Sequence, residues 1–122
     1  LLVNLSGNIT ARTTNMWIKA LGVKLTGDLN LETTGDQIEA HLSSVLDGSV
    51  RLKTAASSIR LWMPADASAD VNVTGAEPTA PFPLPATNDS HGNKRYHGLV
   101  NGGKVRFDLE TSGGGQVYIQ NK

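Results

Sequence analysis

The chain has 122 residues, a size that suits one domain with a single hydrophobic core, and its 11 basic and 11 acidic residues leave no net charge. Without a basic patch, nucleic acid is not an expected partner. The absence of cysteine removes disulfides, thiolate metal sites and cysteine nucleophiles. No apolar run reaches the roughly 20 residues of a membrane span, so we expect no membrane insertion in this segment.

Three stretches near the start of the chain align with one another. They begin at Gly7, Gly27 and Gly48, and within each stretch apolar and polar residues alternate. The alternation is typical of half-buried strands, and a fixed period of about 20 residues is typical of a solenoid. The pattern predicts an all-β fold, a single-stranded right-handed parallel β-helix (β-solenoid) with coils of about 20–21 residues and two or three short strands in each coil.

The inward residues of these stretches form apolar columns if the coils stack in parallel. The predicted columns are Ile9, Leu29, Val50 and Val71; Ala11, Leu31, Leu52 and Val73; and Ile18, Ile38 and Ile59. Each coil would bury these residues against its neighbours.

The outward positions provide a separate indication of the register. One column would contain Arg12, Glu32 and Lys53, and another Lys19, Glu39 and Arg60. Each middle charge would lie about 4.8 Å from two opposite charges in a parallel stack, which favours this register. An antiparallel meander of similar strands is the alternative.

The period breaks at Gly75, where a long excursion over about residues 75–103 begins. Four of the five prolines lie in it, so it cannot be an interior strand. We expect Phe82–Leu84 to fold back over Trp62. The alternation returns in residues 105–111 and 116–119, which predicts a closing coil.

Residues 1–122 therefore form one predicted solenoid domain. Because the first residues read as the middle of a strand, we expect the chain to be a mature or trimmed fragment. In its closing coil, Phe107 and Leu109 would take the places that Val50 and Leu52 hold in an earlier coil.

One outward column is partly apolar, because Leu21, His41 and Trp62 align and Trp17 lies nearby. Such a stripe is either covered by the chain itself or used as a contact surface. The candidate binding residues are Trp17, His41, Trp62, Phe82 and Tyr96.

The residues give little support for a metal site or for catalysis. His91, His97 and Asp89 could converge in the excursion, but polar loops commonly group such residues, and we predict no metal site, cofactor or catalytic residue. Thr13, Thr33 and Thr54, with Thr74 continuing them, form a threonine column. It predicts a hydroxyl ladder at a corner rather than an ice-binding array, which would need two outward threonines in each coil.

The segment from Ser58 to Val71, with its Met-Pro and Ala-Ser-Ala-Asp-Val portions, resembles a bacterial adhesin family of unknown function that is related to autotransporter-adhesin head domains. Gly98–Gly103, Thr111–Gly113 and Val117–Ile119 are also similar. The resemblance covers nearly the whole chain as the C-terminal part of such a domain, implies a β-solenoid exposed at the cell surface or in the periplasm, and brings no catalytic residues.

The expected function is a non-catalytic surface or scaffold domain that binds protein or glycan through one solenoid face and its loop. One alternative is a structural solenoid that assembles with itself through the uncapped strand at Leu1–Leu5. The other is a carbohydrate-active enzyme. It is less favoured because no outward column of the first three coils puts two carboxylates side by side.

Overall fold

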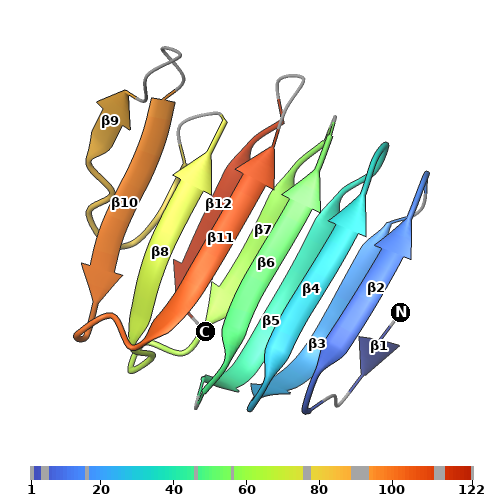
Figure 1. Ribbon diagram of the computed structural model, residues 1–122, viewed down its shortest axis with the longest axis horizontal. Helices are drawn as coiled ribbons and strands as arrows, with labels where there is room; N and C mark the ends of the chain where they lie inside the picture. Colours follow the sequence, from blue (N-terminus) through green and yellow to red (C-terminus); the bar gives the residue numbers. More distant parts are fainter. Residues whose placement is uncertain are drawn as a thin grey trace.

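The computed structural model describes residues 2–3, 6–15, 17–45, 47–55, 57–75, 78–88, 94–111 and 115–121. In these residues the regular structure is entirely β, in two sheets that lie face to face (Figure 1). None of them belongs to a helix able to cross a lipid bilayer.

The five-stranded sheet is parallel throughout and lies behind the other sheet in Figure 1. In spatial order its strands are β1 (Leu2–Val3), β3 (Ile18–Leu25), β5 (Ile38–Val45), β7 (Ile59–Met63) and β12 (Val117–Asn121).

The seven-stranded sheet is mixed. Its spatial order is β2 (Ile9–Thr13), β4 (Asp28–Thr33), β6 (Ser49–Thr54), β11 (Val105–Thr111), β8 (Ala69–Thr74), β10 (Lys94–Val100) and β9 (Ala86–Asn88). The strands from β2 to β8 in this order are parallel, whereas β10 is antiparallel to both β8 and β9. The all-β class and the parallel stacking were predicted, whereas the antiparallel pairing of β10 with β8 and β9 was not.

The predicted register of the first coils is confirmed. Ile9 pairs with Leu29 and Leu29 with Val50, while Ile18, Ile38 and Ile59 form a matching line in the other sheet. Apart from the half-buried Ile9, the residues of these two lines are at most 4% exposed. The alternation of the sequence therefore separates an apolar layer between the sheets from two polar outer faces.

The charge columns are confirmed as well. Arg12, Glu32 and Lys53 lie in register on the outer face of the seven-stranded sheet, and Arg12 and Glu32 form an ion pair of 3.2 Å. Lys19, Glu39 and Arg60 lie in register on the other outer face, where Lys19 and Glu39 are 3.3 Å apart. A shift by one residue would turn these charges toward the core, so they help to fix the register.

The predicted neighbour of β6 is wrong. Val71 was expected to follow Val50 in its column, but β11 lies between β6 and β8, so Phe107 contacts the Val50 position on one side and the Val71 position on the other. Leu109 likewise separates Leu52 from Val73. The position beside β6 is thus occupied by β11, which comes later in the sequence, and not by β8 (Figure 1).

Two turns hold this arrangement together. The side-chain amide of Asn101, which has a φ of 50°, donates to the carbonyl oxygens of Ala65 and Ala67 at 3.1 and 3.0 Å. The backbone amide of Lys104 donates to the Ser68 hydroxyl at 2.8 Å, so the turn before β11 is tied to the turn before β8.

The excursion is not one loop, because Lys94–Val100 is a strand that pairs with β8 over six positions from Ala69 to Thr74. The proline-rich part is not an interior strand, as predicted. Thr79 bridges to Tyr118 of β12, with Thr79 N donating to Val117 O at 2.9 Å. Prolines cannot extend this pairing, so the five-stranded sheet ends there.

Candidate functional site

The outer face of the five-stranded sheet brings aromatic and charged side chains together in two rows. One row follows the register Lys19, Glu39, Arg60 and Tyr118, and the neighbouring row follows His41, Trp62 and Gln120. The inward residues between them, such as Ile59 and Leu61, are buried, and this burial turns the intervening side chains outward. We call this surface the aromatic face; it comprises Trp17, Lys19, Glu39, His41, Arg60, Trp62 and Tyr118.

His41 and Trp62 form a stacked pair. Their ring centroids are 4.1 Å apart and the ring planes differ by 5°. They lie opposite one another in the β5–β7 register, and parallel strands at a spacing of about 4.8 Å hold equivalent side chains at stacking distance. Each ring therefore covers one face of the other, and both residues remain half exposed.

Glu39 joins the two rows. Its carboxylate oxygen lies 3.3 Å from Lys19 Nζ and 3.4 Å from His41 Nε2, and its side chain is only 14% exposed. The ammonium group of Lys19 and the ring nitrogen of His41 thus hold the carboxylate in one place. The arrangement fixes the edge of the His41 ring relative to Lys19.

Each of the other two aromatic rings has a cation over it. Lys19 Nζ lies 5.4 Å from the centroid of the Trp17 ring, and the Arg60 guanidinium lies 5.2 Å from that of Tyr118. The Tyr118 hydroxyl donates to Gln116 Oε1. These contacts restrict the side-chain rotamers, so little conformational entropy remains to be lost when a partner binds.

Trp17 is the exposed aromatic side chain among the described residues of this face. It is 45% exposed, whereas Trp62 is half buried against its neighbours. Trp, Tyr and Arg, which the face contains, are enriched at protein interfaces relative to the rest of the surface. The aromatic face therefore has the composition of a contact surface.

The structure unites Trp17, His41 and Trp62, but it places the other two predicted residues elsewhere. Tyr96 occupies an inward position of β10 and is 7% exposed, so it belongs to the core. Phe82 is half buried against the same core.

The prediction that Phe82–Leu84 covers Trp62 is wrong. A Cβ at Gly98 of β10 would meet Pro83 and Leu84, which places the segment beside β10. The five-stranded sheet ends at β12, whereas the other sheet continues through β8 and β10. Phe82 and Leu84 cover the apolar side of these additional strands.

Arg60, Glu39 and Tyr118 were not predicted as site residues. The charge columns contained Arg60 and Glu39 but marked them only as determinants of register. Tyr118 alternates with the buried Val117 and Ile119, a pattern that indicates an outward side chain. Its place beside Arg60 depends on the position of the last coil, which the pattern alone does not give.

The other candidate sites differ from the aromatic face. The described residues contain no group of three or more His, Asp or Glu side chains that could hold a metal ion. His97 instead pairs with Asp70 at 2.5 Å on the outer face of the seven-stranded sheet, and the predicted partners His91 and Asp89 lie outside the described residues.

The threonine column points inward. Thr33, Thr54 and Thr111 are in register and at most 4% exposed, and Thr74 pairs with Glu110 instead of continuing the column. Buried hydroxyls of this kind form hydrogen bonds within the fold, such as that from Thr54 to the carbonyl oxygen of Asp36 at 2.8 Å. An ice-binding array on this column is excluded, because its hydroxyls do not reach the solvent.

Comparison with known proteins identifies no family for this chain. No family model matches the chain, and neither a curated protein nor a solved structure matches it. The resemblance to the adhesin family therefore rests on the residues quoted above.

Proposed function

We propose that this domain is a non-catalytic, adhesin-like binding module whose contact surface is the aromatic face. In this proposal the chain winds as a single-stranded right-handed parallel β-solenoid. Strands that alternate between two sheets, parallel pairing and register offsets of 20 and 21 residues support that path. The observation that carries the function is the half-exposed Trp17 beside an ordered set of aromatic and charged side chains.

A protein is the favoured partner, with a glycan as the alternative. Trp, Tyr and Arg are the residue types that dominate binding energy at protein interfaces, and the aromatic face has all three. Sugars stack on open ring faces, but His41 and Trp62 cover one another and Arg60 lies over Tyr118. Trp17 is the most exposed of these rings and would be the one to stack on a sugar, although Lys19 lies over one of its faces.

We also propose that the domain works outside the cytoplasm, at the cell surface or in the periplasm. Only the family resemblance supports this location. Protease treatment of intact producing cells, followed by detection of the chain with an antibody, tests the surface location. The periplasmic one is tested by release of the chain on osmotic shock, and retention in the cytoplasmic fraction would contradict both.

The binding proposal is tested with two truncations and a control. Binding partners from the cell envelope are captured, identified, purified and measured again against the wild type, Trp17→Ala, Trp62→Ala and Leu99→Ala. Leu99 is 65% exposed but lies on β10 of the other sheet, so it is a matched apolar control. We expect each tryptophan variant to weaken binding by about tenfold or more, as at interface hot spots, and Leu99→Ala to bind normally.

The same variants are applied to a glycan array. If the wild type binds a glycan on the array and Trp17→Ala does not, the partner is a glycan rather than a protein. If neither a purified protein nor a glycan distinguishes the tryptophan variants from Leu99→Ala, the aromatic face is not the binding surface.

Self-assembly by stacking end to end is less favoured than partner binding. At one end of the seven-stranded sheet, β2 is the outermost strand, and Ile9 and Ala11 are half buried there. At the opposite end the three-residue strand β9 and the prolines close the edge. An open-ended filament needs two ends that pair with each other, so this geometry supports at most pairing through the β2 end.

A further inference from the structure

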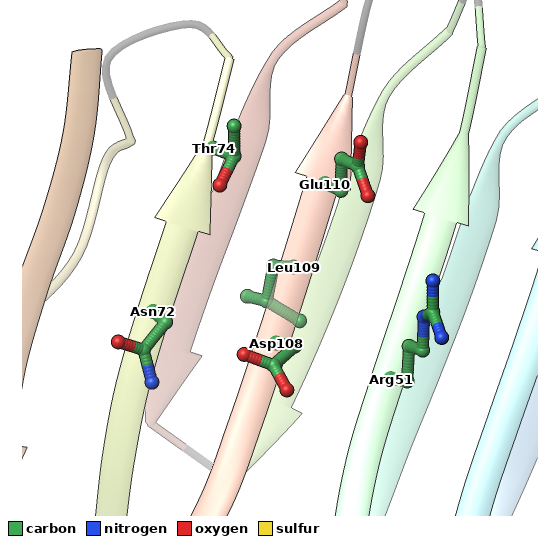
Figure 2. A pocket seen from close by; sticks show the side chains of 6 residues that line it. All are labelled: Arg51, Asn72, Thr74, Asp108, Leu109 and Glu110. Carbon is green, nitrogen blue, oxygen red and sulfur yellow. The ribbon is translucent and has the colours of Figure 1, made fainter. Parts of the chain in front are cut away.

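The outer face of the seven-stranded sheet, on the far side from the aromatic face, contains a shallow depression of about 220 Å³. It is lined by Arg51 of β6, by Asp108, Leu109 and Glu110 of β11, and by Asn72 and Thr74 of β8 (Figure 2). The hollow exists because β11 lies between β6 and β8. In the register, Asp108 lies between Arg51 and Asn72, and Glu110 lies beside Thr74 in the next row.

Several polar groups of this depression are free to bind a ligand. The side chains of Arg51, Thr74 and Glu110 form no hydrogen bond or ion pair with another described residue. Asp108 accepts hydrogen bonds from Arg106 Nε at 3.0 and 3.2 Å, which leaves other lone pairs of its carboxylate open. Asn72 donates only long hydrogen bonds to Asp70, at 3.4 and 3.5 Å, and its side-chain oxygen remains an acceptor.

The lining restricts the class of ligand. The two carboxylates of the lining, Asp108 and Glu110, can only accept hydrogen bonds and so cannot bind the oxygens of phosphate or sulfate, even though Arg106 pairs with Asp108 and Lys53 lies opposite Glu110 in the register. No aromatic side chain lines the hollow, and the side chain of Leu109 is buried in the core, so a lipid or a planar base would find little apolar contact. The volume is below the roughly 300–1,000 Å³ of pockets for drug-sized ligands, which limits the occupant to a small unit.

We propose that this depression binds one neutral sugar ring. Neighbouring hydroxyls of a sugar both donate and accept, which matches carboxylate acceptors at Asp108 and Glu110 and donors at Arg51 and Thr74. The proposal is independent of the aromatic face, since the two surfaces lie on opposite sheets. The proposal assigns no catalytic step to this depression.

The test uses NMR titration of the isotope-labelled chain with methyl glucoside, methyl galactoside and N-acetylglucosamine, and with glucuronate as the charged comparison. We expect saturable shifts at the amides of residues 72–74 and 108–110, with a dissociation constant in the millimolar range for a ligand this small. Glucuronate should bind at least several-fold more weakly than a neutral sugar.

Two matched variants assign the site. Glu110→Gln keeps the shape of the side chain. It should raise the dissociation constant of the sugar by about fivefold or more, because charged acceptors form the stronger hydrogen bonds. Glu32→Gln changes the same outward row on β4, where the carboxylate pairs with Arg12, and should bind normally. Trp17→Ala should also bind normally, so failure here and failure of the aromatic face are distinguishable.

Three outcomes would overturn the proposal. The first is the absence of saturable shifts at these amides with every neutral sugar. The second is equal affinity of Glu110→Gln and Glu32→Gln, and the third is tighter binding of glucuronate than of the neutral sugars. A loss of sugar binding in Trp17→Ala alone would assign the sugar to the aromatic face instead.

Discussion

Phe107 of β11 lies directly beside Val50 of β6 in the parallel register. Its side chain is fully buried and is among the largest in the core. The strand that carries it comes late in the sequence but lies in the interior of the sheet, with β6 on one side and β8 on the other. Removal of the ring should therefore affect both halves of the fold.

We expect Phe107→Ala to lower the free energy of unfolding by about 3–5 kcal/mol, because it removes a buried ring and leaves a cavity. Phe107→Leu should cost less, since it fills more of that space. The measurement is urea unfolding followed by circular dichroism, with the exposed Arg106→Ala as the control on the same strand. A loss below about 1 kcal/mol for Phe107→Ala would show that β11 does not contribute this contact.

The sequence predicts the alternation and the pairing of the early coils because their information is local. Each of Leu29 and Leu31 is followed about one coil later by an equivalent residue, and parallel stacking aligns them. The position of β11 is different. Both β8 and β11 alternate in the same way, so either would satisfy the apolar column beside Val50, and the choice depends on contacts of the distant turn at Asn101.

The same reasoning separates the predicted site residues. Trp17, His41 and Trp62 follow from periodicity within the early coils, where the register is set locally. Phe82 and Tyr96 come from the excursion, whose path has no repeat to guide it, and both pack against the core. The depression beside β11 could not be predicted, because its two walls become neighbours only through the insertion of that strand.

Gly7 and Gly48 lie shortly before strands, and substitutions at them distinguish the cost of backbone strain from the cost of a steric clash. Gly7 and Gly48 have φ values of 82° and 91°, a region that costs an L residue about 1–2 kcal/mol. A Cβ at Gly7 would meet no atom within 4 Å, whereas at Gly48 it would fall on the carbonyl group of Gly27. We expect Gly7→Ala to cost only the backbone strain, and Gly48→Ala to cost about 1–3 kcal/mol more through overpacking.

Urea unfolding of the two glycine variants measures the difference. Equal losses would mean that the neighbouring coil moves away from Gly48 at no cost. That result would argue against close stacking of the coils at this corner.

The buried threonine column should contribute through its hydroxyls. Thr54 is 1% exposed and donates to the carbonyl oxygen of Asp36 at 2.8 Å. Thr54→Val keeps the shape but leaves that oxygen without its donor, so we expect a loss of about 1–3 kcal/mol. Thr10→Val, at an exposed position of β2, should change stability by less than about 0.5 kcal/mol. Similar small effects at both positions in thermal or urea unfolding would contradict the structural role of the hydroxyl.

The stacked rings on the aromatic face should be coupled energetically. A double-mutant cycle with His41→Ala, Trp62→Ala and the double variant isolates their interaction from the effect of each truncation. Because the rings are 4.1 Å apart and nearly parallel, we expect a coupling of about 0.5–1.5 kcal/mol in the free energy of unfolding. A second cycle that combines Trp62→Ala with Thr10→Ala, on the other sheet, should be additive within about 0.5 kcal/mol. If the His41–Trp62 cycle is additive too, the stack does not order the face. In that case Trp62 would have to lose part of its mobility when a partner binds, and the rigid surface assumed for the binding proposal would not exist.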